Sequence, residues 1–182
     1  MNNRKLILYI SMSLDGFIAT KENDISWLSM VEVEGEDYGY NAFNDSVDTY
    51  IVGRITYDTV LSLTGGIFPP ADQHKCYVLT RQERVPKNGV TFYNGDVVEL
   101  IFKLKKEGGK KIYCDGGGEV VKLLMDNNQI DEYIISIVPI VLGDGKRLFK
   151  GGTPRIAVTA VSTKQYASGL VQLHYIRNTS ER

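Results

Sequence analysis

The segment from Lys111 to Asn127 has the residue types of a phosphate-binding turn with an acid beside it. A β-branched and aromatic strand, Lys111–Asp115, is followed by Gly116-Gly117-Gly118 and then by an apolar helix. Glycines let a ligand approach the backbone, and the N–H groups and dipole of a helix N-terminus attract phosphate. Asp115 stands at the strand end, where α/β sheets place their chemistry. A tightly packed turn would need the same glycines, so this motif alone leaves both interpretations open.

Similar residues recur at other strand ends. In a parallel sheet such ends line one edge, so glycines, two arginines and two acids would converge there. Taken singly, each group has a plainer explanation as a turn, a surface helix residue or a solvated loop. The four groups are Asp15-Gly16, Gly53-Arg54 with Thr56, Thr80-Arg81, and Asp115-Gly116.

The glycines at two of these ends predict a pyrophosphate site. Gly53 and the N–H groups of a helix opening at Thr56 would bind one phosphate, with charge from Arg54. Gly117 and Gly118 would bind the other.

A third phosphate is predicted at Arg81, assisted by the hydroxyl of Thr80. A dinucleotide with an extra ribose phosphate is NADPH, so this arrangement favours NADPH over NADH. The G-x-G-x-x-G pattern of Rossmann folds, followed by a later acid, is absent from the chain. The predicted binding mode is therefore a different one.

Strand-like and helix-like segments alternate, which predicts an α/β fold with a largely parallel sheet between helices. Two final strand-like segments have no helix between them and predict an antiparallel hairpin. We expect residues 1–182 to form one domain. The predicted strands are Leu6–Met12, Tyr50–Val52, Cys76–Thr80, Lys111–Asp115, Tyr133–Pro139, Arg155–Thr163 and Leu170–Arg177. The predicted helices are Asp37–Ser46, Thr56–Ser62, Val97–Glu107 and Glu119–Asn127.

Composition excludes several classes of partner. A net charge of −1 gives no general attraction for nucleic acid. Cys76 and Cys114 form neither a metal cluster nor a disulfide framework, and they indicate a reducing compartment. The apolar stretch Ile134–Gly143 contains Pro139 and is too short to cross a bilayer. We expect a cytoplasmic protein without a metal or a membrane segment.

Several motifs together resemble the dihydrofolate reductase-like family, specifically the branch with the reductase domain of riboflavin biosynthesis, the RibD C-terminal domain. They span almost the whole chain in the order found in the family. The motifs are Ser13-Leu-Asp-Gly-Phe-Ile-Ala19, Asp48-Thr-Tyr-Ile-Val-Gly-Arg-Ile-Thr-Tyr57, Val78-Leu-Thr-Arg81, Asp115-Gly-Gly-Gly118, Ile130-Asp-Glu-Tyr133, Pro139-Ile-Val-Leu-Gly143 and Arg147-Leu-Phe149.

The resemblance implies a three-layer fold and a hydride transfer from NADPH to a C=N or C=O bond of a heterocycle or sugar. It also implies a homodimer, because relatives of this branch often pair. Ile18 and Ala19 would lie near the nicotinamide. The implied cofactor-binding residues are Ile18, Ala19, Gly53, Arg54, Thr56, Thr80, Arg81, Gly116, Gly117, Gly118, Glu119 and Val120.

The segment after Trp27 departs from both groups of relatives. Dihydrofolate reductases carry one substrate-binding acid on the first helix. Here Glu32, Glu34, Glu36 and Asp37 all follow Trp27 and the sequence does not choose among them; we take Glu32 and Asp37 as the candidate catalytic acids. Riboflavin reductase domains carry basic residues in this region to hold a ribosyl phosphate. Between Asp24 and Gly53 this chain has several acids and no Lys or Arg, which would repel phosphate. We therefore hypothesise a neutral or cationic heterocyclic substrate, although a solvated acidic helix face would look the same.

Asp115 is a further candidate catalytic residue. Beside a nicotinamide, desolvation would raise its pKa and suit it to donating a proton. Alternatively, its carboxylate caps the helix that follows the glycines. Tyr38, Tyr40 and Phe43 have helical spacing, and we expect core packing from them more than a substrate pocket.

Three functions follow. The first is an NADPH-dependent reductase of a small pterin- or pyrimidine-like substrate, in which the protein mainly positions the reactants. The second is the 5-amino-6-(5-phosphoribosylamino)uracil reductase of riboflavin biosynthesis. The third is a nucleotide-binding regulatory protein that keeps the fold without turnover.

Overall fold

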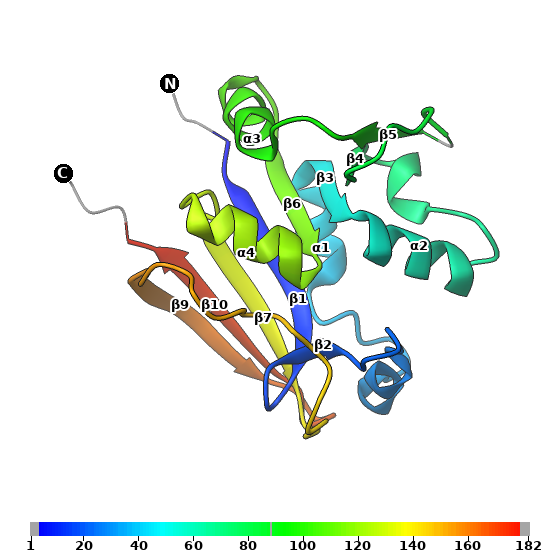
Figure 1. The fold of residues 1–182 in the computed structure, drawn as a ribbon. Coiled ribbons are helices and arrows are strands. Elements are labelled where there is room, and N and C mark those ends of the chain that lie inside the picture. Colours follow the sequence, from blue (N-terminus) through cyan, green and yellow to red (C-terminus); the bar gives the residue numbers. More distant parts are fainter. Residues whose placement is uncertain (1–3, 88, 179–182) are drawn as a thin grey trace.

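The computed structural model describes residues 4–87 and 89–178, and an eight-stranded sheet forms its centre (Figure 1). In spatial order the strands are β5 (Val90–Tyr93), β4 (Lys75–Leu79), β3 (Val47–Gly53), β6 (Lys111–Gly116), β1 (Leu6–Ser13), β7 (Glu132–Val138), β10 (Val171–Arg177) and β9 (Val158–Gln165). Neighbours from β5 to β7 are parallel, and β10 and β9 add an antiparallel hairpin. The predicted α/β class and the C-terminal hairpin are confirmed.

Helices cover both faces of this sheet. They are α1 (Tyr40–Asp45), α2 (Arg54–Leu63), α3 (Val97–Lys106) and α4 (Gly118–Asp126), with 3₁₀ turns η1 (Ser26–Val31) and η2 (Pro69–Asp72). Figure 1 shows α3 and α4 in front of the sheet and α1 behind it. Because strand side chains alternate, Leu8 and Cys114 pack in the core under α3 and α4, whereas Tyr9 and Tyr113 pack with Phe43 of α1.

Helix α1 is shorter than the predicted helix Asp37–Ser46. Tyr38 and Gly39 have φ angles of 57° and 80°, in the left-handed region that a right-handed helix does not use. The carboxylate of Asp37 instead accepts the N–H groups of Gly39 at 2.9 Å and Asn41 at 3.1 Å. This tight turn sets where α1 begins.

Three short strands escape the sequence analysis. One is β5, and the other two are β2 (Phe17–Ala19) and β8 (Lys146–Arg147), which pair in a small antiparallel sheet. Strands of two to four residues are too short to show an alternating pattern. This small sheet places the segment around Arg147 beside the loop that follows β1.

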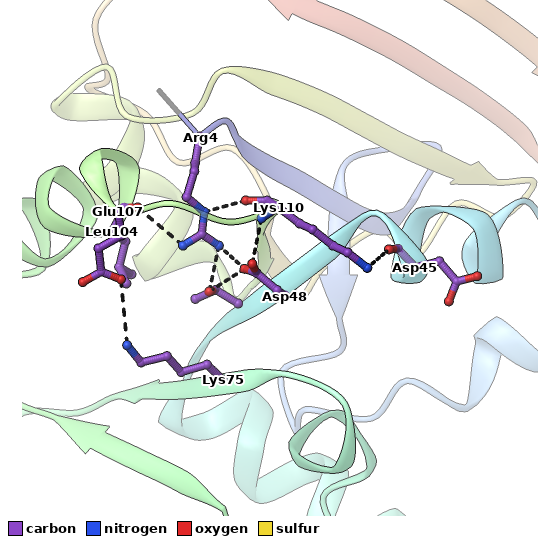
Figure 2. A network of polar contacts seen from close by, with 8 residues as sticks. Arg4, Asp45, Asp48, Lys75, Leu104, Glu107 and Lys110 are labelled. Atoms are coloured by element: carbon purple, nitrogen blue, oxygen red, sulfur yellow. Dashed lines mark hydrogen bonds and ion pairs between the residues drawn. The ribbon is translucent and has the colours of Figure 1, made fainter. Parts of the chain in front are cut away.

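Figure 2 shows the polar network at the amino ends of β1, β3 and β6. Arg4 is buried, with 8% of its surface exposed, and donates to the carbonyl of Lys110 at 2.5 Å and to Oγ1 of Thr49 at 2.9 Å. Its guanidinium also pairs with Asp48, whose other oxygen accepts the N–H of Lys110 at 2.7 Å. The network joins three strands, because Arg4 lies two residues before β1, Asp48 and Thr49 are the second and third residues of β3, and Lys110 directly precedes β6.

Candidate functional site

The predicted cofactor residues of β3 and β6 meet at the carboxyl edge of the sheet. A Cβ added to Gly53 would lie 3.1 Å from Cγ2 of Val120 and 3.6 Å from the nitrogen of Gly117. A Cβ on Gly117 would lie 3.3 Å from Oγ1 of Thr56 and 3.7 Å from Cδ1 of Ile18. Five residues from three separate stretches of the chain are therefore neighbours. The absence of side chains at both glycines leaves backbone facing this junction.

Two helices begin at the same junction. Gly53 is the N-cap of α2, which starts at Arg54 rather than at the predicted Thr56, and Gly117 is the N-cap of α4. Glycine has no side chain with which to cap, so the first N–H groups of both helices remain donors for an anion. Gly116 has φ 93°, a conformation that favours glycine, and its peptide bond to Gly117 is cis.

The predicted charged and hydroxyl ligands have local partners. Arg54 pairs with Asp58 at 2.5 Å, and both side chains are about two-fifths exposed, so the guanidinium remains accessible. The hydroxyl of Thr80 accepts the N–H of Gln82 at 3.2 Å and retains its own proton to donate. Arg81 next to it is exposed.

The remaining cofactor candidates flank the junction. The pKa of Glu119 lies below its ordinary value, first because Lys150 donates to its carboxylate, with a smaller contribution from the charge of Arg81. Arg81 therefore lies within electrostatic range of the start of α4. Ala19 is buried in β2, and its carbonyl oxygen would lie 2.3 Å from a Cβ on Gly145.

Asp115 is held by two tyrosines. The Tyr50 hydroxyl donates to its Oδ2, and the Tyr113 hydroxyl donates to its Oδ1 at 2.9 Å. Burial raises the pKa of Asp115 to about 6, although both hydrogen bonds act to lower it. The alternative role as a helix cap is wrong, because Gly117 is the N-cap of α4 and the Asp115 oxygens accept from the tyrosines. Its role in proton transfer stays a prediction.

Tyr50 and Tyr113 are the residues of this site that the sequence analysis misses. Tyr113 and Asp115 are two positions apart on one strand, so their side chains share a face. That spacing is a usable signal. Tyr50 comes from β3, and only the parallel pairing of β3 with β6, which places Tyr50 opposite Tyr113, brings it to the carboxylate.

An open cleft of about 550 Å³ lies on the same face of the sheet as Asp115. Tyr40 connects the cleft with Asp115. It lines the cleft, and its own pKa is raised first by burial and then by the negative charge of Asp115. Among the described residues that line the cleft, four are acidic and none is Lys or Arg. The residues that line the cleft are Tyr9, Ser11, Leu28, Val31, Glu32, Val33, Glu34, Glu36, Asp37, Tyr38, Tyr40, Ser136 and Leu170.

Both candidate acids of the insert line this cleft. Asp37 is committed to the start of α1, and the N–H groups of Gly39 and Asn41 hold its pKa below the ordinary value. It is therefore ionised and suited to attracting a cation. Glu32 is exposed directly after η1. Either role in catalysis stays a prediction.

The three aromatic residues of the insert divide between core and cleft. Phe43 is buried and stacks on Tyr9 at 4.4 Å between ring centroids. Tyr38 packs edge-on against Tyr166 and donates to Ser168 at 2.9 Å, while part of it reaches the cleft. Tyr40 has 36% of its surface exposed. The expectation of core packing holds for Phe43 and in part for Tyr38, whereas Tyr40 belongs to the cleft.

Asp15 has a structural arrangement. Its carboxylate accepts from the Ser13 hydroxyl at 2.6 Å and from the N–H groups of Leu142 at 3.1 Å and Gly143 at 2.7 Å. It therefore ties the loop after β1 to the loop after β7. The plainer interpretation of Asp15-Gly16 as a turn matches this geometry.

Within residues 4–87 and 89–178, no three His, Cys, Asp or Glu side chains gather as metal ligands would. Within the same residues no helix is long and apolar enough to cross a membrane.

Comparison with known proteins places this architecture. A dihydrofolate reductase from Enterococcus faecalis, solved with NADP(H), covers 96% of this chain and 97% of its own with a TM-score of 0.65 at 15% identity. A Shewanella sp. PV-4 protein with a provisional riboflavin-biosynthesis name has a TM-score of 0.87 at 30% identity, covering 96% of this chain and 99% of its own. The fold is thus that of the dihydrofolate reductase-like proteins.

Comparison of sequences identifies the family within this fold. The model of the RibD C-terminal domain family matches residues 4–172, and the chain belongs to that family. The uncharacterized protein YwjB of Bacillus subtilis (strain 168) is 43% identical over 175 residues, which are 96% of this chain and 98% of YwjB. The resemblance to the riboflavin branch is therefore confirmed.

Proposed function

We propose that the protein is an NADPH-dependent reductase that reduces a C=N or C=O bond of a small pterin- or pyrimidine-like heterocycle. The observation that carries this proposal is the junction of Ile18, Gly53, Thr56 and Gly117 at the turn that follows Asp115. Asp115 lies near the end of β6, and Gly117 follows it by two residues as the N-cap of α4, so the proposed proton donor and the proposed cofactor-binding backbone belong to one short stretch of chain. Membership in a reductase-type family supports the same reading.

The residues present fit NADPH, because a Cβ on Gly53 or Gly117 would fill the space at the junction. The N–H groups at the starts of α2 and α4 would bind the pyrophosphate, with Arg54 adding charge. Arg81 and Thr80 would bind the ribose phosphate. When bound, the cofactor supplies a hydride.

Asp115 would supply the proton. With a pKa of about 6, a fraction of its carboxyl groups is protonated near neutral pH, as a general acid requires. Tyr50 and Tyr113 fix the carboxyl by donating to both of its oxygens. A fixed acid loses little orientational freedom when the substrate arrives.

The cleft would hold the substrate. Tyr9, Tyr38 and Tyr40 offer aromatic surface to a flat ring, and the four acids beside them disfavour an anion. We infer a neutral or cationic heterocycle without a phosphate. A phosphorylated pyrimidine reduced faster than its dephosphorylated form would contradict this inference.

Family membership also supports the second candidate, the 5-amino-6-(5-phosphoribosylamino)uracil reductase of riboflavin biosynthesis. Its substrate carries a phosphate, and the acidic cleft argues against it. A comparison of the phosphorylated and dephosphorylated forms of this substrate therefore tests both candidates at once. The regulatory alternative would be favoured by tight NADPH binding without turnover across pterin, pyrimidine and cyclic imine acceptors.

A homodimer in the cytoplasm is part of the proposal. Strand β9 is an edge strand exposed along its whole length, and Val158 and Val161 are 41% and 51% exposed. Such an edge offers unpaired backbone groups and apolar side chains to a second copy. Sedimentation velocity should give the mass of two chains, and a monomer at micromolar concentration would refute the dimer.

The first test is titration of the protein with NADPH and then NADH, followed by the fluorescence of Trp27 and the tyrosines. We expect NADPH to bind more tightly than NADH. Absence of binding by both would refute the reductase.

A further inference from the structure

The small sheet of β2 and β8 brings a basic segment over the glycine turn. Phe17 pairs with Arg147, whose guanidinium also lies 4.5 Å from the Phe17 ring centre. Lys150 follows three residues later. A Cβ on Gly118 would lie 2.5 Å from the carbonyl oxygen of Arg147 and 3.4 Å from Cε of Lys150. The Lys150 side chain therefore lies against the first residue of α4.

Lys150 pairs there with an acid. Its Nζ donates to Oε1 of Glu119, the second residue of α4. The Lys150 side chain is 36% exposed and that of Glu119 is 72% exposed. An ion pair this exposed contributes little to stability, so exchanging the partner of Lys150 costs little. The charge of Arg81 acts on the same carboxylate.

The location gives the pair a functional meaning. The start of α4 attracts anions through its N–H groups and dipole, and Glu119 carries a negative charge into this region. A phosphate oxygen binding near Gly118 would meet repulsion from Glu119 and attraction from Lys150. A phosphate group and the carboxylate would thus compete for one ammonium group.

We propose that Lys150 is a further phosphate-binding residue of the cofactor site. In this proposal Glu119, which the family resemblance implies as a cofactor-binding residue, instead competes with the cofactor for Lys150. Lys150 leaves Glu119 when a phosphate of the dinucleotide binds at Gly118. This assignment rests on the proposed function in naming NADPH as the ligand. It adds a cation from the segment after β8, which none of the recognised motif residues supplies.

Two variants test the assignment by the sign of their effects. Lys150→Met keeps the aliphatic stem against Gly118 and should weaken NADPH binding about tenfold, because a charge-assisted bond is lost. Glu119→Gln removes the competitor and should tighten binding about threefold. If the pair were only a structural tie, both variants would break it and change the affinity in the same direction. Changes of the same sign would therefore overturn the proposal.

Lys122→Met is the matched control. Lys122 lies on the same helix and pairs with Asp126 at 2.8 Å, one turn further from the glycines. The Lys122→Met substitution removes an equal charge, and its effect on NADPH affinity should be clearly smaller than that of Lys150→Met. Equal effects would mean that only net charge matters and would overturn the role of Lys150. The melting temperatures of all three variants should stay close to that of the wild type.

Inorganic pyrophosphate as a second probe separates this assignment from the proposed function. Opposite shifts for both NADPH and pyrophosphate support the two together. If NADPH does not bind but pyrophosphate binds with opposite shifts, the phosphate assignment stands and the reductase fails. If NADPH binds equally to wild type and both variants, the reductase stands and the assignment fails. Binding of neither probe overturns both.

Discussion

The two edges of the sheet use their polar groups differently. At the amino ends of β1, β3 and β6, buried Arg4 donates to Lys110, Thr49 and Asp48. At the carboxyl ends of β3 and β6, glycines stand where side chains would otherwise fill the space. The first edge uses its polar groups on one another (Figure 2). The second leaves the N–H groups at the starts of two helices without a capping side chain on the N-cap residue. Charge at the first edge therefore serves stability, whereas the open donors at the second are the ones that we propose for phosphate binding.

Asp115→Asn tests the functional edge with the largest expected effect. Turnover with a substrate should fall by about 10²–10⁴-fold, because the amide has no proton of suitable acidity to donate. NADPH affinity should change little, and the variant should stay folded near neutral pH. Stopped-flow NADPH oxidation measures the rate. Retained turnover would remove Asp115 from the chemistry, and Tyr50→Phe, which keeps the acid, should cost far less.

Asp48→Ala tests the structural edge. It leaves the buried Arg4 guanidinium without its carboxylate, so the free energy of unfolding should fall by about 3 kcal/mol. NADPH affinity should be unchanged in the folded protein. The control, Asp126→Ala, breaks an exposed pair with Lys122 and should cost about 0.5 kcal/mol. Urea unfolding measures both, and similar losses would mean that the network is no stronger than a surface pair.

Gly117→Ala sharpens the contrast, because it should leave the fold intact. The φ of Gly117 is −70°, which alanine adopts, but its methyl would lie 3.3 Å from Thr56 and 3.7 Å from Ile18. NADPH affinity should fall about tenfold or more, or about 1.4 kcal/mol, because the methyl occupies the junction. Gly151→Ala is the control, since a Cβ there meets nothing within 4 Å. Unchanged affinity in Gly117→Ala would place the cofactor elsewhere.

The pH dependence of stability offers a separate test of Asp115. Its pKa is raised in the folded protein from 3.8 to about 6, so its stabilising contribution is complete below about pH 4 and is lost as the pH rises through about 6. Relative to the wild type, Asp115→Asn should therefore gain about 2 kcal/mol between pH 4 and pH 8. Urea unfolding at both pH values measures this, and a constant difference would contradict the raised pKa.

Arg81→Ala has the smallest expected effect. It should weaken NADPH binding by about 1 kcal/mol, because in our proposal the exposed arginine would contact the ribose phosphate in high dielectric. NADH affinity should stay the same, since NADH lacks this phosphate. Arg84→Ala is the charge control, because Arg84 lies three residues after Arg81 and pairs with Asp58 at 3.9 Å. Equal losses for both cofactors would move the ribose phosphate away from Arg81.

Prediction from the sequence succeeded where the signal was local. Strand β6, the glycine turn and α4 are consecutive in the chain, so composition and spacing were enough to predict them in order. Helix α1 was predicted too long because Tyr38 and Gly39 form a left-handed turn before it. Tyrosine has no strong preference for the left-handed conformation. The short strands β2 and β8 were missed because their pairing is entirely non-local.

The sequence alone determined that glycines and cations follow several strand ends and that the insert is acidic. Tertiary structure alone decided which of these groups meet. Parallel pairing of β3 with β6 brought Gly53 to Gly117 and Tyr50 to Asp115, and the pairing of β2 with β8 carried Lys150 to Glu119. The pKa of Asp115 depends on burial beneath residues from other segments. Distances between residues far apart in the chain follow from strand order, and strand order is a property of the whole core.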